Sequence, residues 1–122
     1  MTKNRKTLHK KLWKLISLYI RKRDGGRCFT CGVIKPIQEQ HCGHYHDASV
    51  SNPELNFNEK NLACQCPRCN LFLSGNKVIY AYNLTKRYGA GILDELMAIK
   101  NKQVKWTEED YLERIKRYDT NR

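Results

Sequence analysis

The sequence of 122 residues predicts a single mainly helical α+β domain over 1–122. Three observations favour this class. Apolar residues recur at helical spacing near both ends of the chain, the short segment 40–45 resembles one arm of a β-hairpin, and two Cys-x-x-Cys pairs flank that segment. A chain of this length has a modest core, so a metal cross-link would add much to its stability.

The first predicted element is an amphipathic helix over 7–23. Its apolar residues recur at steps of three and four, and Trp13 and Ile20 widen the same face, so we interpret both as core residues. Asp24-Gly25-Gly26 ends the helix.

The charge is concentrated in this region. Residues 1–27 contain ten Lys or Arg and one acid, so about +9 of the net charge of +11 lies there. Such asymmetry favours a polyanionic partner over an anionic membrane surface, although a solvated basic helix without a partner is the simpler alternative. The basic positions expected to bind a DNA backbone are Lys10, Lys11, Lys14, Arg21, Lys22 and, beyond the helix, Arg68.

After the irregular stretch 28–62, further helices are expected. One begins near Pro67, because proline suits a first helical turn, and Ser74-Gly75-Asn76 breaks it. Asn76 is then expected to cap a helix over 77–88, and another covers 92–99. Thr107, followed by three acids, predicts the start of a last helix that ends at Tyr118. The C-terminal helices thus occupy 77–118, and Trp106 is expected to pack at the entrance of the last one.

The two Cys-x-x-Cys pairs predict a structural zinc site. Four thiolates at this spacing saturate a tetrahedral Zn²⁺, so the ion would not be catalytic. A disulfide framework is the alternative, but the N-terminus lacks a secretory signal, and the apolar run 12–20 is too short to cross a bilayer. We therefore expect a reducing, cytoplasmic location. The expected zinc ligands are Cys28, Cys31, Cys66 and Cys69.

Other potential ligands lie between the pairs. Three of the four histidines occur at positions 41, 44 and 46, and in an extended segment His44 and His46 share one face while His41 points to the other. Cys64 is most simply a buried thiol. Cys42 has the same simplest interpretation, but its neighbours leave metal ligation open.

These motifs, in this order, resemble a known family. The first Cys-x-x-Cys, Gly43-His44-Tyr45, residues 57–61, Gln65 to Asn70 and Ser74-Gly75-Asn76 are similar to the phage NinG (Rap) recombination proteins. The resemblance covers roughly residues 10–118 and is most specific over 43–76. More broadly, residues 28–76 resemble a zinc-containing HNH nuclease with a ββα-metal (His-Me finger) core. Phage endonuclease VII, a junction resolvase, has a comparable plan, with an Asn directly after its last zinc cysteine.

The resemblance implies catalytic roles. His44 matches the first HNH histidine and would be the general base that activates water; its ordinary pKa near neutrality suits that task. Asn61 matches the middle Asn, which braces the loop and helps to orient the histidine. Asn70 matches the third position and would bind a catalytic Mg²⁺ or Mn²⁺.

One position departs from the HNH pattern. Many HNH proteins have an Asp directly before the base, where this chain has Gly43. The missing ligand could come from His41, Glu59, His46 or Asp47; His41 is preferred, then Glu59. Glu59 is equally well interpreted as a surface acid, and Asp47 as a turn residue.

The expected function is therefore a metal-dependent endonuclease for branched DNA, such as Holliday junctions or D-loops in phage recombination, located in the host cytoplasm. A nicking or restriction-type nuclease on duplex DNA, a non-catalytic zinc-stabilised DNA-binding module and a treble-clef protein-interaction module are the alternatives. Paired cuts would need two active sites, so a homodimer is a further hypothesis.

Overall fold

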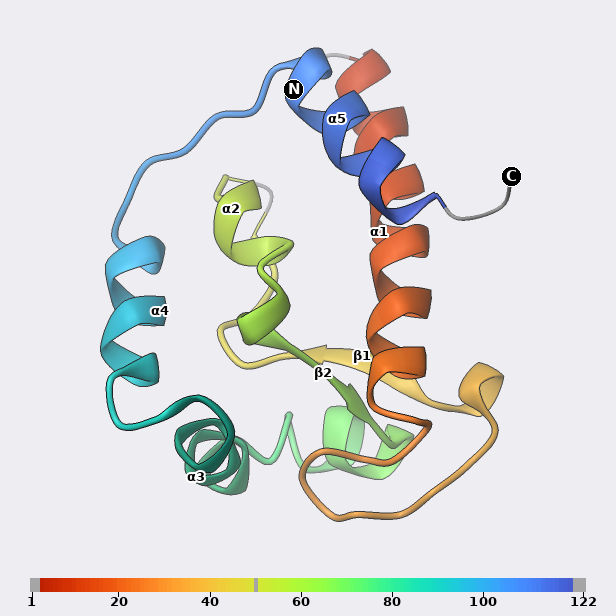
Figure 1. Cartoon of the computed structure of the whole chain (residues 1–122), viewed down its shortest axis with the longest axis vertical. Coiled ribbons are helices and arrows are strands. Elements are labelled where there is room, and N and C mark those ends of the chain that lie inside the picture. Colours follow the sequence, from red (N-terminus) through yellow and green to blue (C-terminus); the bar gives the residue numbers. More distant parts are fainter. Residues whose placement is uncertain (1–2, 50, 120–122) are drawn as a thin grey trace.

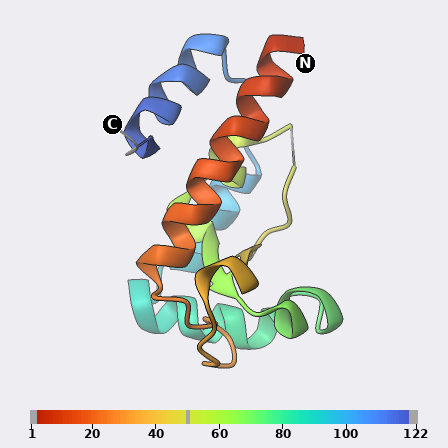
Figure 2. The same cartoon turned by 90° about the vertical axis from the view of Figure 1, so that its right-hand side faces the viewer.

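A computed structural model describes residues 3–49 and 51–119, and its cartoon is shown in Figures 1 and 2. The secondary structure confirms a mainly helical α+β chain with one two-stranded sheet in the described residues. The elements in chain order are α1 (Lys3–Arg23), η1 (Ile37–Glu39), β1 (His41–His44), α2 (Pro53–Asn56), η2 (Glu59–Asn61), β2 (Leu62–Gln65), η3 (Arg68–Phe72), α3 (Lys77–Tyr88), α4 (Ile92–Lys100) and α5 (Glu108–Tyr118).

The helix predicted over 7–23 is present as α1 and begins four residues earlier. Figure 2 shows it running along one side of the molecule with α5 beside it. Ile20 is fully buried, as expected for a core residue. Trp106 is also buried, and its ring stacks on Phe57 with 5.6 Å between centroids, which confirms its expected packing role.

The segment 40–45 does form one arm of a hairpin. Strand β1 pairs antiparallel with β2, with His41 opposite Gln65 and His44 opposite Leu62. The hairpin lies between α1 on one side and α3 and α4 on the other (Figure 1). Because side chains alternate along a strand, the hairpin contributes Cys42 to the core against α1 and Ala63 to the core against α3 and α4.

Arg23 and Asp24 fasten the end of α1 to β2. The Arg23 guanidinium donates to the carbonyls of Glu59 and Leu62, both at 2.9 Å, and Asp24 accepts the backbone N–H of Cys64 at 2.9 Å. Asp24 therefore does more than end a helix: with Arg23 it sets where the hairpin lies against the basic helix.

The later helices are close to the predicted ranges, with one correction. Asn76 occupies the N-cap position of α3, but its side chain accepts no backbone N–H of the helix: its φ is +49° and its amide nitrogen donates to Cys69 Sγ at 3.8 Å. The helix expected near Pro67 is the short π-helical turn η3. At α5 the capping box is present, since Thr107 Oγ1 accepts from Asp110 N at 3.2 Å and the Asp110 carboxylate accepts from Thr107 N at 2.8 Å. In the part of the chain that the structure describes, no helix has the length and apolarity that a bilayer crossing requires.

Candidate functional site

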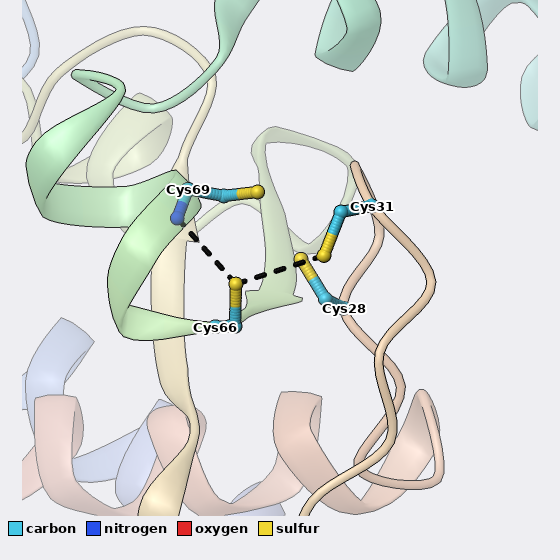
Figure 3. A group of neighbouring side chains, drawn as sticks. All are labelled: Cys28, Cys31, Cys66 and Cys69. Carbon is cyan, nitrogen blue, oxygen red and sulfur yellow. Dashed lines mark hydrogen bonds between the residues drawn. The ribbon is translucent and has the colours of Figure 1, made fainter.

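The four predicted zinc ligands lie together (Figure 3). Their Sγ atoms are all within 4.8 Å of one another, and those of Cys31 and Cys66 are 3.7 Å apart. A tetrahedral zinc with Zn–S bonds of about 2.3 Å requires sulfurs about 3.8 Å apart, so the donors and their spacing suit the ion. Cys28, Cys66 and Cys69 are buried, whereas Cys31 is exposed. The cluster is therefore consistent with a closed structural zinc site.

Local hydrogen bonds fix the conformation of both Cys-x-x-Cys turns. In the first, Cys28 N donates to Val33 O and Gly32 N to Cys28 O, both at 2.8 Å. In the second, Cys69 N points at Cys66 Sγ at 3.4 Å. Burial opposes ionisation of Cys28, but hydrogen bonds from Thr30 and nearby backbone amides outweigh it and lower its pKa to about 6. Donors aimed at sulfur stabilise the thiolate form that binds metal.

The two remaining cysteines differ from these four. Cys42 and Cys64 lie opposite each other across the hairpin, and both are buried. Burial raises the pKa of each thiol to about 12, so both stay protonated. Among the described residues the metal-ligand group does not include them, and Cys42 packs in the apolar core. The buried-thiol interpretation fits both.

Beside the zinc cluster, a cavity of about 250 Å³ brings together residues from β1, the loop after it, η3 and α3. His44 and Asn70, 26 positions apart in the sequence, both line it. The remaining lining residues are Asp47, Ala48, Ser74, Gly75 and Lys77. The cavity is thus polar, and it places an imidazole and a carboxamide at the same opening.

The ring of His44 is held on two sides. Its Nε2 lies 3.1 Å from the carbonyl oxygen of Asn56, and its plane stacks on Trp13 at 5.0 Å and 17°. A carbonyl only accepts hydrogen bonds, so Nε2 carries the proton and Nδ1 keeps the lone pair. Burial lowers the pKa of His44 below its ordinary 6.5, so the neutral form persists into mildly acidic solution.

His41 and Asn70 meet on the opposite face of β1. The amide nitrogen of Asn70 lies 3.0 Å from Nδ1 of His41. A Cβ at Gly43 would stand 3.1 Å from Asn70 Oδ1 and only 1.9 Å from Gln65 Oε1. The buried Gln65 therefore fills the space that a side chain at position 43 would need.

The same face carries several potential donors for a hard cation. Gln65 Oε1 is buried and has no hydrogen-bond partner in the described part of the chain. With the amide oxygen of Asn70 and a nitrogen of His41, this face offers the oxygen-rich donor set that Mg²⁺ and Mn²⁺ prefer.

Asn61 and Glu59 lie outside the cavity. Asn61 is fully buried; its Oδ1 accepts from His46 N at 2.9 Å and its amide nitrogen donates to His46 O at 3.1 Å, so it holds the loop that follows His44. Glu59 instead accepts a hydrogen bond from the Tyr118 hydroxyl on α5. The structure thus brings His41, not Glu59, to Asn70.

The other two ligand candidates also differ. His46 does not line the cavity. Burial lowers the pKa of its imidazole, and its Nε2 is buried without a hydrogen-bond partner among the described residues. Asp47 does line it, and its carboxylate pairs with Lys77 at 3.0 Å. Lys77, which the sequence patterns did not single out, also donates to the carbonyls of His44 and Tyr45. A lysine in a helix first turn has no sequence signal for this role.

Most of the predicted DNA-binding cations are exposed. Arg21 is an exception, because its guanidinium donates to Ser17 O at 3.0 Å and to Ile37 O at 2.9 Å and so joins α1 to η1. Lys14 follows Trp13 directly, so this exposed cation lies close to the helix position that touches His44. The exposed cations of the predicted set are Lys10, Lys11, Lys14, Lys22 and Arg68.

These features define a class: a small, mainly helical α+β domain with a four-cysteine site suited to zinc and a polar histidine–asparagine cavity beside it. The chain belongs to the NinG family. The sequence model of that family, described as Bacteriophage Lambda NinG protein, matches residues 1–122.

Similar curated proteins support the same family assignment. The chain is 35% identical over 102 residues to Protein ninG of Escherichia phage lambda and 34% identical to its counterpart from Salmonella phage P22. These matches cover 83% of this chain but 48% and 49% of the relatives, so the chain spans about half their length. No solved structure matches the chain.

Proposed function

We propose that this protein is a metal-dependent DNA endonuclease that hydrolyses phosphodiesters in branched recombination intermediates. The observation that supports it best is the cavity shared by His44 and Asn70, with His41 within hydrogen-bond distance of the Asn70 amide. This arrangement places a neutral imidazole, which has a free lone pair for a proton, and an amide that can bind a cation at the same opening.

His44 is the general base in this proposal. Its Nδ1 accepts the proton of the attacking water, while the Asn56 carbonyl accepts a hydrogen bond from Nε2–H and stabilises the imidazolium that forms. Stacking on Trp13 fixes the ring plane, so little reorientation is needed. Asn61 acts as a positioning residue, because it fixes the loop after the base without touching the cavity.

Asn70 and His41 would hold the catalytic Mg²⁺ or Mn²⁺. When bound, such a cation neutralises phosphate charge and stabilises the departing 3′ oxygen. The Lys77 ammonium, whose nitrogen lies 3.0 Å from the Asp47 carboxylate, adds a positive charge at the same opening. The carbonyls of His44 and Tyr45 also bind this ammonium, so Lys77 keeps the chain after the base in place.

The basic face of α1 would bind the DNA. Lys10 and Lys14 are exposed and lie four residues apart, on the same side of the helix. Phosphate contacts of this kind position a duplex without reading its sequence. Preference for branches would then depend on shape and deformability, and paired cuts would be made by a homodimer.

A cleavage assay tests the proposal. The zinc-loaded protein is incubated with linear duplex and with a four-way junction in Mg²⁺ or Mn²⁺, beside the His44→Ala variant. We expect metal-dependent products from the junction, and none from the variant. Equal cleavage of both substrates would favour the duplex nuclease instead. No product from either, with salt-dependent binding retained, would leave a non-catalytic DNA-binding module.

A further inference from the structure

The turn η3 exposes a cation and an aromatic ring together. Phe72 is 83% exposed, and Arg68 is exposed as well. The backbone N–H of Leu73 donates to Arg68 O at 2.9 Å, which closes a π-helical turn. Residues about one turn apart share a side of a helix, so Arg68 and Phe72 lie on the same side. In the described part of the chain, the Arg68 guanidinium has no hydrogen-bond or ion-pair partner.

This turn borders the candidate catalytic cavity. Asn70 precedes Phe72 by two residues and Ser74 follows it by two, and both line the cavity. In Figure 2 the green segment that contains η3 projects from the body next to the start of α3. Its base is rigid, because Cys69 belongs to the zinc cluster and Asn70 N donates to Cys66 O at 2.9 Å.

The surrounding chain is apolar and positively charged. Of the twelve large apolar side chains that are exposed among the described residues, six lie within 71–82. From position 60 to position 93 the sequence has five Lys or Arg and no acid. Asp24, Asp47 and Glu95 from other segments pair with Arg87, Lys77 and Lys60, so the cations of this segment without an ion pair among the described residues are Arg68 and Lys86. A second copy of this chain docked on the same patch would bring these unpaired cations together. Cations beside exposed aromatic groups instead suit a nucleic acid whose bases are unstacked.

We propose that η3 is a wedge for branched DNA: Phe72 stacks on an unstacked base at the branch point while Arg68 binds the adjacent phosphate. This inference rests on the proposed function and names the element that selects branches. Unstacking costs least where pairing is already interrupted, so a wedge favours a junction over a continuous duplex.

The test is a binding measurement with the zinc-loaded His44→Ala protein, which keeps the DNA intact. A four-way junction carries 2-aminopurine at its branch, and its fluorescence and affinity are followed with and without Phe72→Ala. We expect Phe72→Ala to abolish the fluorescence change and to weaken junction binding about tenfold, the usual size for one lost base–aromatic stack. Duplex binding should change by less than about twofold, and Phe72→Tyr should keep both signals. Leu112→Ala on α5 is the control, since it removes another exposed apolar side chain, one that lies far from Phe72 in the sequence.

Two outcomes would overturn the wedge. One is an equal effect of Phe72→Ala on junction and duplex, or an unchanged fluorescence signal. The other is dissociation of a dimer by Phe72→Ala in sedimentation, with the fluorescence intact, which would make the patch a self-association surface. Circular dichroism and zinc content show that the variant is folded. A Phe72-dependent signal from a protein that cleaves no DNA when His44 is present would support the wedge and contradict only the nuclease.

Discussion

The four-cysteine cluster and the histidine–asparagine cavity share the segment Cys69-Asn70 yet differ in every property that decides their chemistry. The cluster offers four sulfurs within 4.8 Å, enough to saturate one zinc ion. The cavity offers nitrogen and oxygen donors around about 250 Å³ of open space. One site can therefore hold an ion permanently, while the other leaves room for phosphate and water. The closed site fixes the geometry of the open one.

Removing the zinc site should have the largest effect. Structural zinc contributes roughly 10–16 kcal/mol of apparent folding free energy, so Cys66→Ser or a strong chelator should unfold residues on both sides of the cluster. Circular dichroism and zinc analysis measure this. Cys42→Ala is the matched control and should keep one zinc per chain, because Cys42 lies in the apolar core. Zinc loss in this control would mean that the ligand set is assigned incorrectly.

Changing the open site should leave folding intact and abolish chemistry. His44→Ala is expected to lower the cleavage rate by about 10²–10⁴-fold, the usual contribution of a general base. Zinc content and junction affinity should stay close to those of the parent protein. The readouts are single-turnover cleavage and binding in the same buffer. A variant that still cleaves at the parent rate would remove His44 from the proposed role.

The face shared by Gly43 and Gln65 can be tested by filling it. Gly43→Ala puts a Cβ 1.9 Å from Gln65 Oε1, so we expect a loss of about 1–3 kcal/mol in the free energy of unfolding. Denaturant titration of the zinc-loaded protein measures this. Gln65→Ala removes the group with which the new Cβ would clash. We therefore expect Gly43→Ala to lower the free energy of unfolding less in the Gln65→Ala background than in the parent protein. Strict additivity of the two changes would show that they do not share this space.

The smallest expected effect is a shift with pH. Because the folded-state pKa of His44 lies below 6.5, the base stays neutral at pH 6.5, and the cleavage rate should fall only at lower pH. The unfolded state binds the proton first, so this histidine's contribution to stability is present above about pH 6.5 and is lost as the pH falls from there toward the folded pKa. The rate–pH profile and denaturation at two pH values measure both. An acid limb above pH 6.5 would contradict the lowered pKa.

Sequence patterns predicted the elements better than their contacts. The helical spacing of α1 and the capping residues of α5 are local signals, and both elements appear where expected. Asn76 is the N-cap residue as predicted but makes no side-chain cap hydrogen bond, because a residue type does not reveal that the backbone is left-handed and that the side-chain amide is directed at a sulfur. Arg21 and Glu59 likewise use their polar groups on partners 16 and 59 positions away, which no local pattern encodes.

By itself, the sequence determined the four-cysteine set suited to zinc, the mainly helical α+β class and the family, because cysteine spacing, apolar periodicity and motif order are properties of the chain. Tertiary structure alone decided that His41 meets Asn70, that Asn56 and Trp13 orient His44, and that Gln65 fills the space beside Gly43. The physical reason is that hydrogen bonds and close packing join atoms from distant segments, and their geometry exists only once the hairpin, α1 and η3 have packed together.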